Sequence, residues 1–288
     1  MNGNGNNRVI SANIHITGDC NYDCRFCFSR NRKGSATLRP DEWFPILKDL
    51  ICVHGIDKVN FAGGEPLLYP GLGECIRFCK QLGATTSVVT NGSILDRSFL
   101  EKVSGCLDWI GLSIDSVHED TEFMLGRNTG NCNHLENVLT ASTEAKSLGL
   151  LVKLNVTVTR QSVNDDFHDI VDIVSPDRLK FLQVSMIPGT NDEGFMETSV
   201  PNEDFEDFIR RHSDIILENE SHPVFETSRD MMDSYLMLDS LGRIRLGTTG
   251  GYVYMPYQMY WNGSLKVNED AYVRRGGLYR WSVKGAGE

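Results

Sequence analysis

Three cysteines lie close together near the amino terminus, in the stretch GDCNYDCRFCFSR (18–30). Cys20, Cys24 and Cys27 have C-x3-C-x2-C spacing and follow an apolar, β-branched run directly. Structural zinc sites commonly take four ligands from paired C-x2-C elements, whereas three thiolates leave one iron of a [4Fe–4S] cluster without a protein ligand. The spacing therefore favours a cluster whose fourth iron is open to a substrate or cofactor.

A second motif with possible chemistry is AGGEP (62–66), at the end of an apolar run. Gly63 and Gly64 allow a backbone to approach a ligand closely, and Glu65 offers a carboxylate to an ammonium group. An ordinary strand-to-helix turn has the same composition. Its place after the cysteine triplet favours the binding interpretation.

Polar residues two apart recur in five of the expected strands. Residues two apart in a strand point to the same face, and one such pair is most simply a strand end facing water. Five pairs favour a shared polar cavity walled by strands. The pairs are Asn13 and His15, Lys58 and Asn60, Ser113 and Asp115, Lys153 and Asn155, and Arg178 and Lys180.

The elements that must position these residues alternate regularly. Strands are expected at 9–17, 57–63, 85–90, 108–115, 151–158 and 179–187, and helices at 40–55, 71–83, 97–105, 134–149, 164–176 and 202–219. Cys75 and Cys79 have i, i+4 spacing and are expected on a helix face. Six βα repeats predict an α/β parallel sheet. An open doubly wound sheet and a partly closed barrel are the alternatives, and the polar strand faces favour the barrel.

Composition limits the setting. The chain has 288 residues and a net charge of −11, which argues against a general nucleic-acid binder. No apolar run is long enough to span a bilayer, and the first residues carry no signal pattern. Eight cysteines are too few for a disulfide scaffold of this length. We expect a cytoplasmic protein without membrane association, with a disordered tip (1–8), a barrel (9–219) and a carboxyl-terminal extension (220–288) closing the active site.

The cysteine triplet, with Phe26 before its last member, and the GGEP turn resemble those of radical S-adenosylmethionine (SAM) enzymes. The match to the viperin-like members covers about residues 9 to 282. In chain order it includes CNYDCRFCF, VNFAGGEP, TNGS, LGR, NHLEN, KLNV, DRLKFLQ, DSYLMLD and RRGGLYRWS. The amphipathic membrane helix of the animal proteins is lacking, and residues 240–270 match poorly, which leaves base selection in doubt.

This resemblance implies a partial (βα)6 barrel of the TIM type that binds a [4Fe–4S] cluster and SAM. It also implies a lyase that converts a nucleoside triphosphate to its 3′-deoxy-3′,4′-didehydro form in antiviral defence, after hydrogen abstraction at the ribose C4′. CTP is the expected substrate, with UTP or GTP possible. An electron donor such as flavodoxin or ferredoxin is the expected partner.

Site residues follow from the same resemblance. Cys20, Cys24 and Cys27 bind the cluster, and Tyr235 assists the final reduction. The residues expected to contact SAM are Phe26, Gly63, Gly64, Glu65, Asn91, Ser113, Arg127 and Gln183, of which Ser113 and Arg127 hold its carboxylate. Those expected to contact the nucleotide are Asn13, Lys58, Asn60, Lys153, Asn155, Arg178, Lys180 and Arg275. Buried cations of this kind are costly unless they face an anion such as a triphosphate.

Simpler interpretations stay open for several residues. Tyr235 is alternatively a core tyrosine with a satisfied hydroxyl, Arg127 a solvated loop residue, and Lys58 and Lys180 exposed strand-end lysines. For the whole chain, the alternatives are a radical SAM enzyme acting on another substrate such as a peptide, and a non-catalytic iron–sulfur or zinc module. The absence of cysteines after Cys132 speaks against the peptide alternative.

Overall fold

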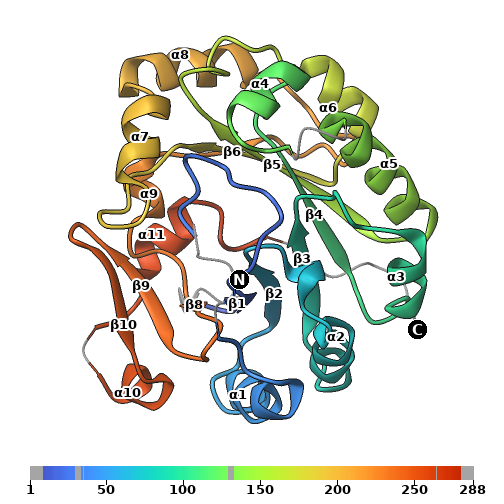
Figure 1. The fold of residues 1–288 in the computed structure, drawn as a ribbon, viewed down its shortest axis with the longest axis vertical. Helices are drawn as coiled ribbons and strands as arrows, with labels where there is room; N and C mark the ends of the chain where they lie inside the picture. Colours follow the sequence, from blue (N-terminus) through green and yellow to red (C-terminus); the bar gives the residue numbers. More distant parts are fainter. Residues whose placement is uncertain (1–8, 30–33, 35, 129–132, 264, 280–288) are drawn as a thin grey trace, which may run out of the picture.

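The computed structural model describes residues 9–279 except 30–33, 35, 129–132 and 264. Its centre is one sheet of ten strands in the order β10-β9-β8-β1-β2-β3-β4-β5-β6-β7 (Figure 1). The predicted disordered tip, Cys132 and the end of the RRGGLYRWS stretch lie outside the described residues.

All six predicted strands are present, and each pairs in parallel with the next. They are β1 (Ser11–Thr17), β2 (Lys58–Gly63), β3 (Thr85–Thr90), β4 (Trp109–Ile114), β5 (Leu151–Val158) and β6 (Arg178–Gln183). β6 is shorter than predicted, because residues 184–187 leave the sheet before α7 begins at Asp192.

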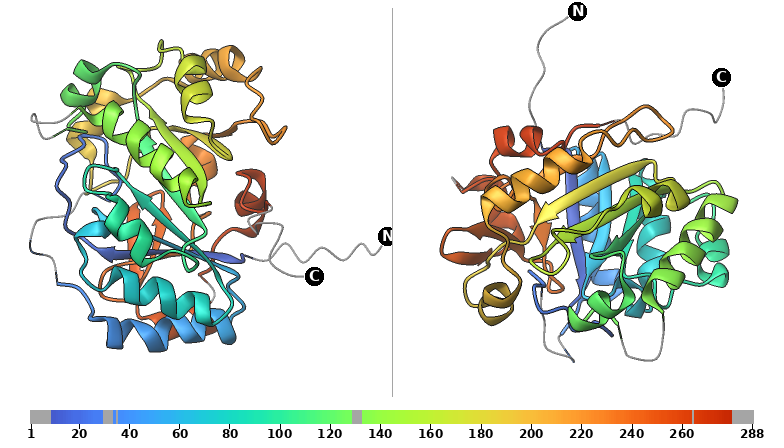
Figure 2. Two further views of the ribbon diagram at one scale, coloured as in Figure 1. Left: turned by 90° about the vertical axis from the view of Figure 1, so that its right-hand side faces the viewer. Right: turned by 90° about the horizontal axis from the view of Figure 1, so that it is seen from above.

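The sheet is a partial barrel. Its strands follow one another in chain order from β1 to β7, whereas a doubly wound sheet reverses strand order at a switch point. The edge strands β7 (Val224–Glu226) and β10 (Gly251–Met255) do not pair with each other, so the barrel is not closed. Figures 1 and 2 show the sheet curled, with helices along its outer side. The prediction of a partly closed barrel is confirmed.

The six predicted helices are all present. They are α1 (Pro40–Cys52), α2 (Leu72–Gln81), α3 (Arg97–Lys102), α5 (His134–Ser147), α6 (His168–Val174) and α8 (Asn202–His212). However, α8 ends at His212 and not at residue 219 as predicted, and α6 begins at His168 and not at residue 164. In α2, Cys75 and Cys79 are fully buried, which confirms them as helix-face residues. Two short helices that the sequence did not predict, α4 (Glu119–Met124) and α7 (Asp192–Thr198), lie next to the cysteine loop.

The carboxyl-terminal part continues the sheet at both edges. β7 extends it beyond β6, while β8 (Met237–Leu238) pairs in parallel with β1 and leads to the antiparallel pair of β9 (Ile244–Thr248) and β10. Short helices complete this part: α9 (Ser228–Met231), α10 (Tyr257–Asn262) and α11 (Glu269–Arg274). Among the described residues, no helix is both long and apolar enough to cross a membrane.

The apolar core lies between the sheet and the outer helices, and this decides which strand side chains face the inside of the barrel. In β1, Ala12, Ile14 and Ile16 are fully buried in the apolar core and alternate with Asn13 and His15. Because successive strand residues point to opposite faces, packing the apolar set against the helices turns the polar set toward the inside of the curl. The polar pairs therefore share one chamber.

Candidate functional site

The three cysteines lie in the loop that follows β1. Cys24 is buried, and Cys20 and Cys27 are partly buried. Two sulfurs on one zinc ion lie within about 4.6 Å of each other, because each Zn–S bond is ~2.3 Å. Of the described histidine, cysteine and acidic side chains, the one set of three whose ligand atoms all lie within 4.8 Å does not include these thiols. Their wider spacing fits an iron–sulfur cluster better than a single ion.

Three glycines from other parts of the chain hold the cysteine loop by its backbone. A β-carbon at Gly64 would lie 2.1 Å from the carbonyl oxygen of Asp19, and one at Gly126 would lie 2.3 Å from that of Asp23. Gly126 also has a φ of +81°, a conformation that favours glycine. The third glycine is Gly194 of α7, which packs on the loop at Arg25. No larger residue fits at these contacts without moving the loop.

The glycines of the GGEP turn therefore have a visible role besides the predicted one. The amide of Gly64 donates to the carbonyl of Thr17 over 2.9 Å, and the amide of Glu65 donates to that of Asp19 over 2.7 Å. Gly63 has a φ of +147°, and a β-carbon there would lie 2.3 Å from the Thr17 carbonyl oxygen. The turn packs against the segment that leads into Cys20. Contact of Gly63 and Gly64 with SAM stays a prediction.

Burial keeps the cysteine thiols protonated in the absence of a metal. It raises the pKa of Cys20 to about 11 and also raises the pKa values of Cys24 and Cys27, while the positive charge of Arg127 acts on all three in the opposite direction. Because the thiolate is the form that ligates metals, loading of the cluster releases protons from this loop.

Arg127 is mostly buried near the loop, with 11% of its side chain exposed, and is not a solvated loop arginine. Its Nε forms an ion pair with Asp115 and lies 3.9 Å from Glu122, and its guanidinium lies 5.7 Å from the ring centre of Phe26. Within the described chain, its two terminal nitrogens have no hydrogen-bond partner. They are the groups available to a carboxylate, as the resemblance implies for SAM.

Glu65 and Asn91 join the turn to the cysteine loop. The Glu65 carboxylate is fully buried and accepts from the Thr90 hydroxyl over 2.7 Å and from the amides of Asn91 and Leu67 over 2.8 and 3.1 Å. The Asn91 side chain donates to that of Asn21 over 2.9 Å. A carboxylate has about four acceptor positions, so one remains for the predicted ammonium.

Gln183 has a similar structural role. Its amide nitrogen donates to the Val200 carbonyl over 3.1 Å and to Asn202 over 3.0 Å, and its oxygen accepts from the Ser228 amide over 3.0 Å. Its amide nitrogen thus joins β6 to Val200 and to the start of α8, and its oxygen joins β6 to α9. Ser113 lies in β4 opposite Asn155 of β5.

The polar pairs line up across the strands. Lys153 of β5 lies between Gly111 and Arg178, and Asn155 lies between Ser113 and Lys180. On the other side of the barrel, Asn13 and Asn60 are register partners, and their side chains share a hydrogen bond of 2.8 Å. The predicted nucleotide contacts from β1, β2, β5 and β6 therefore face one interior.

The lysines in this interior are buried, so the exposed strand-end interpretation of Lys58 and Lys180 is wrong. Only 5% of Lys58 and 4% of Lys180 is exposed. The Lys58 ammonium donates to the Tyr279 hydroxyl over 2.6 Å, and the Arg178 guanidinium lies 3.6 Å from the centre of the same ring. Burial, together with the charges of Arg178 and Lys180, lowers the pKa of Lys58 to about 7.

The cations differ in their partners. The ammonium of Lys180 pairs with Glu226, whose second oxygen accepts from the Tyr235 hydroxyl over 2.5 Å. Arg275 lies 4.0 Å from Glu226 and 3.5 Å from the ring centre of Tyr235. Among the described residues, Lys153 has no hydrogen-bond or ion-pair partner, and burial lowers its pKa well below the ordinary value. Lys153 therefore lacks an anionic partner among the described residues, whereas Lys180 has one in Glu226.

Three further residues of the site were not predicted from the sequence. Glu226 neutralises part of its charge, Tyr279 contacts two of its cations, and Arg245 of β9 is buried beside the cysteine loop. Arg245 lies within the poorly matching stretch 240–270. The signal available for it was the alternation of polar and apolar residues in IRLGT, which places Arg245 on one face of a strand.

The chamber is ordered along the barrel axis. Lys58 and Arg178 are the first residues of β2 and β6, Asn60 is two residues further along, and Gly63 ends β2 beside the cysteine loop. At ~3.3 Å per residue, Lys58 and Gly63 are separated by about 16 Å. Since parallel strands share their direction, Lys58 and Arg178 lie at the end of the chamber opposite the cysteines.

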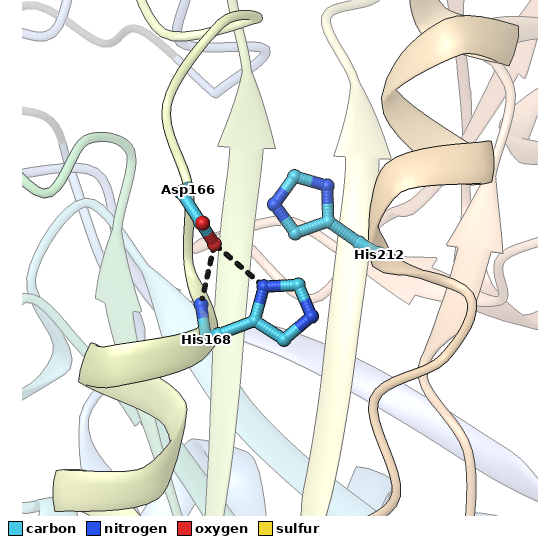
Figure 3. A group of neighbouring side chains, drawn as sticks. All are labelled: Asp166, His168 and His212. Atoms are coloured by element: carbon cyan, nitrogen blue, oxygen red, sulfur yellow. Dashed lines mark hydrogen bonds and ion pairs between the residues drawn. The ribbon is translucent and has the colours of Figure 1, made fainter.

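Asp166, His168 and His212 form a separate group at the start of α6 and the end of α8 (Figure 3). The His168 Nδ1 contacts Asp166 over 2.5 Å, and its Nε2 contacts Asp214 over 3.1 Å. In His212, Nδ1 donates to the Phe208 carbonyl and Nε2 accepts from the Phe167 amide. With these nitrogens engaged in hydrogen bonds, the group joins α6 to α8 in this structure.

Comparison with known sequences identifies relatives over nearly the whole chain. A model of the radical SAM superfamily matches residues 14–174. A protein of Thermoplasmatales archaeon (strain ISO4-H5), named S-adenosylmethionine-dependent nucleotide dehydratase, is 37% identical over 94% of this chain and 96% of its own length. Proteins with this name in Flammeovirga pacifica (32% identical, 96% and 98% covered) and, as RSAD2, in Oncorhynchus mykiss (31%, 94% and 80%) also match.

Solved structures share the fold at low sequence identity. Streptococcus suis SuiB bound to S-adenosylmethionine superposes with a TM-score of 0.63 at 18% identity and covers 92% of this chain and 67% of its own. The enzyme anSMEcpe with bound AdoMet gives a TM-score of 0.65 at 15% identity, with 91% and 81% covered. At such identities these likenesses bear on the fold alone.

Proposed function

Because the chain belongs to the radical SAM superfamily, and within it to the S-adenosylmethionine-dependent nucleotide dehydratases, we propose that it converts a nucleoside triphosphate to the 3′-deoxy-3′,4′-didehydro nucleotide. CTP is the proposed substrate, with UTP and GTP as the alternatives. The proposed setting is antiviral defence in the cytoplasm.

The observation that carries this proposal is the order of groups along the barrel. The cysteines follow β1 at one end of the chamber, Lys58 and Arg178 begin β2 and β6 at the other end, and Asn60 and the register pair of Asn155 and Lys180 lie between them. A nucleoside triphosphate has a matching order, with a ribose whose C4′ must approach the cleaved SAM and a chain of phosphates beyond it. A peptide substrate offers no comparable reason for buried cations at that depth.

Each group of residues has a defined task in this proposal. Cys20, Cys24 and Cys27 hold the [4Fe–4S] cluster, and the free terminal nitrogens of Arg127 hold the SAM carboxylate. When bound, the reduced cluster supplies the electron that splits SAM into methionine and a 5′-deoxyadenosyl radical. The buried walls keep water from the radical. Lys153 and its neighbours bind the phosphates, and Asn13, Asn60 and Asn155 orient the ribose.

Tyr235 and Glu226 serve the last step. After the C4′ hydrogen has moved to the deoxyadenosyl group, the 3′-hydroxyl takes up one proton and leaves as water, and one electron then converts the remaining nucleotide radical cation to the product. The Tyr235 hydroxyl is protonated, because burial raises its pKa, and it donates to Glu226 over 2.5 Å. We assign Tyr235 as the residue that supplies this proton and this electron, with Glu226 holding it in position; the external electron donor and a solvent proton then restore the tyrosine.

An electron donor such as flavodoxin or ferredoxin is the remaining partner in the proposal. A cavity of about 730 Å³ lies against the cysteine loop, and its lining includes Asn21, Asp23 and Arg25 of that loop and Phe123 and Met124 of α4. Because this cavity adjoins the loop that would hold the cluster, it supports electron transfer from a donor bound at α4 and the cysteine loop. Dithionite replaces the donor in the assay below.

Anaerobic turnover tests the proposal. The reconstituted protein is reduced with dithionite and given SAM with CTP, UTP, GTP or ATP in separate reactions. We expect one triphosphate, CTP first, to stimulate both 5′-deoxyadenosine and a nucleotide lighter by one water. Slow cleavage of SAM without stimulation by any triphosphate would overturn the substrate assignment while leaving the cluster and SAM chemistry intact.

A further inference from the structure

Arg245 is a buried cation that pairs with no acidic residue of the described chain. Its exposed fraction is 3%, and no carboxylate of the described chain lies within ion-pair distance. Its Nε has no hydrogen-bond partner. The contacts of its other atoms are with the His15 ring nitrogens at 3.1 and 3.0 Å, the Ser29 hydroxyl at 3.2 Å, the Met237 sulfur at 3.7 Å, and the rings of Phe28 and Tyr252 at 5.9 and 4.5 Å.

None of these neighbours neutralises the guanidinium. His15 is uncharged, because burial and the charge of Arg245 lower its pKa well below the ordinary value. Burying a charge without a partner is costly. Arginine keeps its proton in proteins, so it does not escape this cost by becoming neutral. The fold therefore holds a positive charge in a place where the described chain supplies no negative one.

The contacts of Arg245 lead to the end of the cysteine loop. The Ser29 hydroxyl accepts a hydrogen bond from the Arg245 guanidinium and shares another with Nδ1 of His15 over 3.0 Å. The Ser29 amide donates to the sulfur of Cys27 over 3.4 Å. The positive charge of Arg245 also acts on Cys27 itself. The metal–thiolate group that Cys27 would help to hold is thus an anion on which the charge of Arg245 acts.

We propose that Arg245 is the counter-charge of the [4Fe–4S] cluster and that it raises the cluster's reduction potential. On reduction, the cluster gains one electron from an external reductant and becomes more negative by one unit. A fixed positive charge in a poorly polarisable interior stabilises that state more than the oxidised one. Through Ser29 it also orders the N–H···S contact at Cys27, and hydrogen bonds to the sulfurs tune the potential of such clusters.

This role deepens the proposed function, because it rests on the cluster and needs no particular nucleotide. It also explains why a residue of the carboxyl-terminal extension reaches back to the first strand. Arg245 is a positioning residue in this scheme and is not assigned to substrate binding. Its effect belongs to the electron-transfer step that precedes any chemistry on the nucleotide.

A redox titration of the reconstituted holoenzyme, without SAM or nucleotide, tests the proposal. The reduced cluster is followed by electron paramagnetic resonance in the wild type, Arg245→Gln, Arg245→Lys and Arg243→Gln. In Arg245→Gln we expect the ratio of reduced to oxidised cluster at a fixed potential to fall about tenfold. This corresponds to a midpoint potential more negative by ~59 mV for a one-electron couple. Arg245→Lys should recover much of this shift.

Arg243→Gln is the matched control, because Arg243 is the residue two before Arg245, is exposed and pairs with Asp239. It should keep the wild-type potential. An unchanged midpoint in an Arg245→Gln protein with full iron content would overturn the proposal, and a raised KM for the triphosphate in that protein would reassign Arg245 to the nucleotide. Should Arg245→Gln fail to fold, Ser29→Ala provides the test, with a smaller shift of the same sign expected and an unchanged midpoint again counting against the proposal.

Discussion

Gly194 of α7 lies so close to Arg25 of the cysteine loop that a β-carbon at the glycine would stand 1.7 Å from the Arg25 carbonyl oxygen. The same loop end is held by Asn191, whose side chain donates to the Phe26 carbonyl over 2.9 Å. Helix α7 thus packs directly against the backbone of the segment that carries Cys24 and Cys27.

Gly194→Ala should lower both stability and iron content. Glycine in a helix costs roughly 0.5–1 kcal/mol relative to alanine, so propensity alone predicts a gain, whereas overpacking against a backbone atom costs about 1–3 kcal/mol. We expect a net loss, measured by thermal unfolding and by iron bound after reconstitution. Gly73→Ala in α2 is the control, since its nearest neighbour would be a flexible arginine atom at 3.4 Å. Equal behaviour of the two variants would contradict the support role of α7.

Lys153→Met should stabilise the free protein and weaken nucleotide binding. The substitution removes a partly buried cation without a partner among the described residues and keeps a side chain of similar length. A hydrogen bond to a charged group contributes about 1.5–3 kcal/mol, so the dissociation constant of the triphosphate should rise roughly 10- to 100-fold. Thermal unfolding and equilibrium binding measure the two effects. Substitution of the exposed Lys48 of α1 by Met should change neither, and a destabilised Lys153→Met with wild-type affinity would refute the assignment.

Nucleotide binding should take up protons above neutral pH. The pKa of Lys58 is lowered to about 7 in the free protein, below its ordinary value of ~10.4, so at pH 8 most of the free protein has a neutral Lys58. A triphosphate favours the ammonium form, which must then gain a proton. Calorimetry in buffers of different ionisation enthalpy should show uptake at pH 8 that declines toward pH 6.5, and less uptake in Lys58→Met. Proton release at pH 8 would be incompatible with this assignment.

The same shift predicts how stability depends on pH without nucleotide. Because the folded pKa of Lys58 is depressed, its burial imposes no cost above the unfolded pKa, and the cost grows as the pH falls toward 7. Lys58→Met should therefore stabilise the free protein more at pH 7 than at pH 10.

Tyr235→Phe should separate SAM cleavage from product formation. The variant keeps the ring under Arg275 but removes the hydroxyl that donates to Glu226. We expect 5′-deoxyadenosine to form while the yield of dehydrated nucleotide falls at least ~10²-fold, the lower range for loss of a proton-transfer group. Tyr257→Phe, which removes a hydroxyl bonded to Asp49 over 2.8 Å outside the chamber, is the control. Parallel loss of both products in Tyr235→Phe would indicate a packing role instead.

His168 should stabilise the protein at slightly acidic pH. Hydrogen bonds to Asp166 and Asp214 raise its pKa above the ordinary 6.5. A raised folded pKa gives a contribution that is complete below about 6.5 and is lost as the pH rises through the folded value. The difference in unfolding free energy between wild type and His168→Gln should accordingly be larger at pH 6 than at pH 8. A pH-independent difference would contradict this, and stabilisation by added zinc would show that the group binds metal after all.

The sequence by itself determined the elements and much of the site. The period of two in β-strands fixes which side chains share a face, so Lys153, Asn155 and Lys180 were assigned to one interior from their spacing. The cysteine spacing is equally local, because all three thiols lie in one loop. These features depend on short stretches of chain, in which geometry follows directly from residue order.

Only the tertiary structure decided which polar groups have partners. Lys180 meets Glu226 and Lys153 meets no carboxylate of the described chain, although the two lysines look alike in sequence. Gly194 and Arg245 reach the cysteine loop from positions more than 160 residues later in the chain. Such contacts arise from the order and curl of the strands. Whether a buried charge is paired therefore depends on residues from distant parts of the chain.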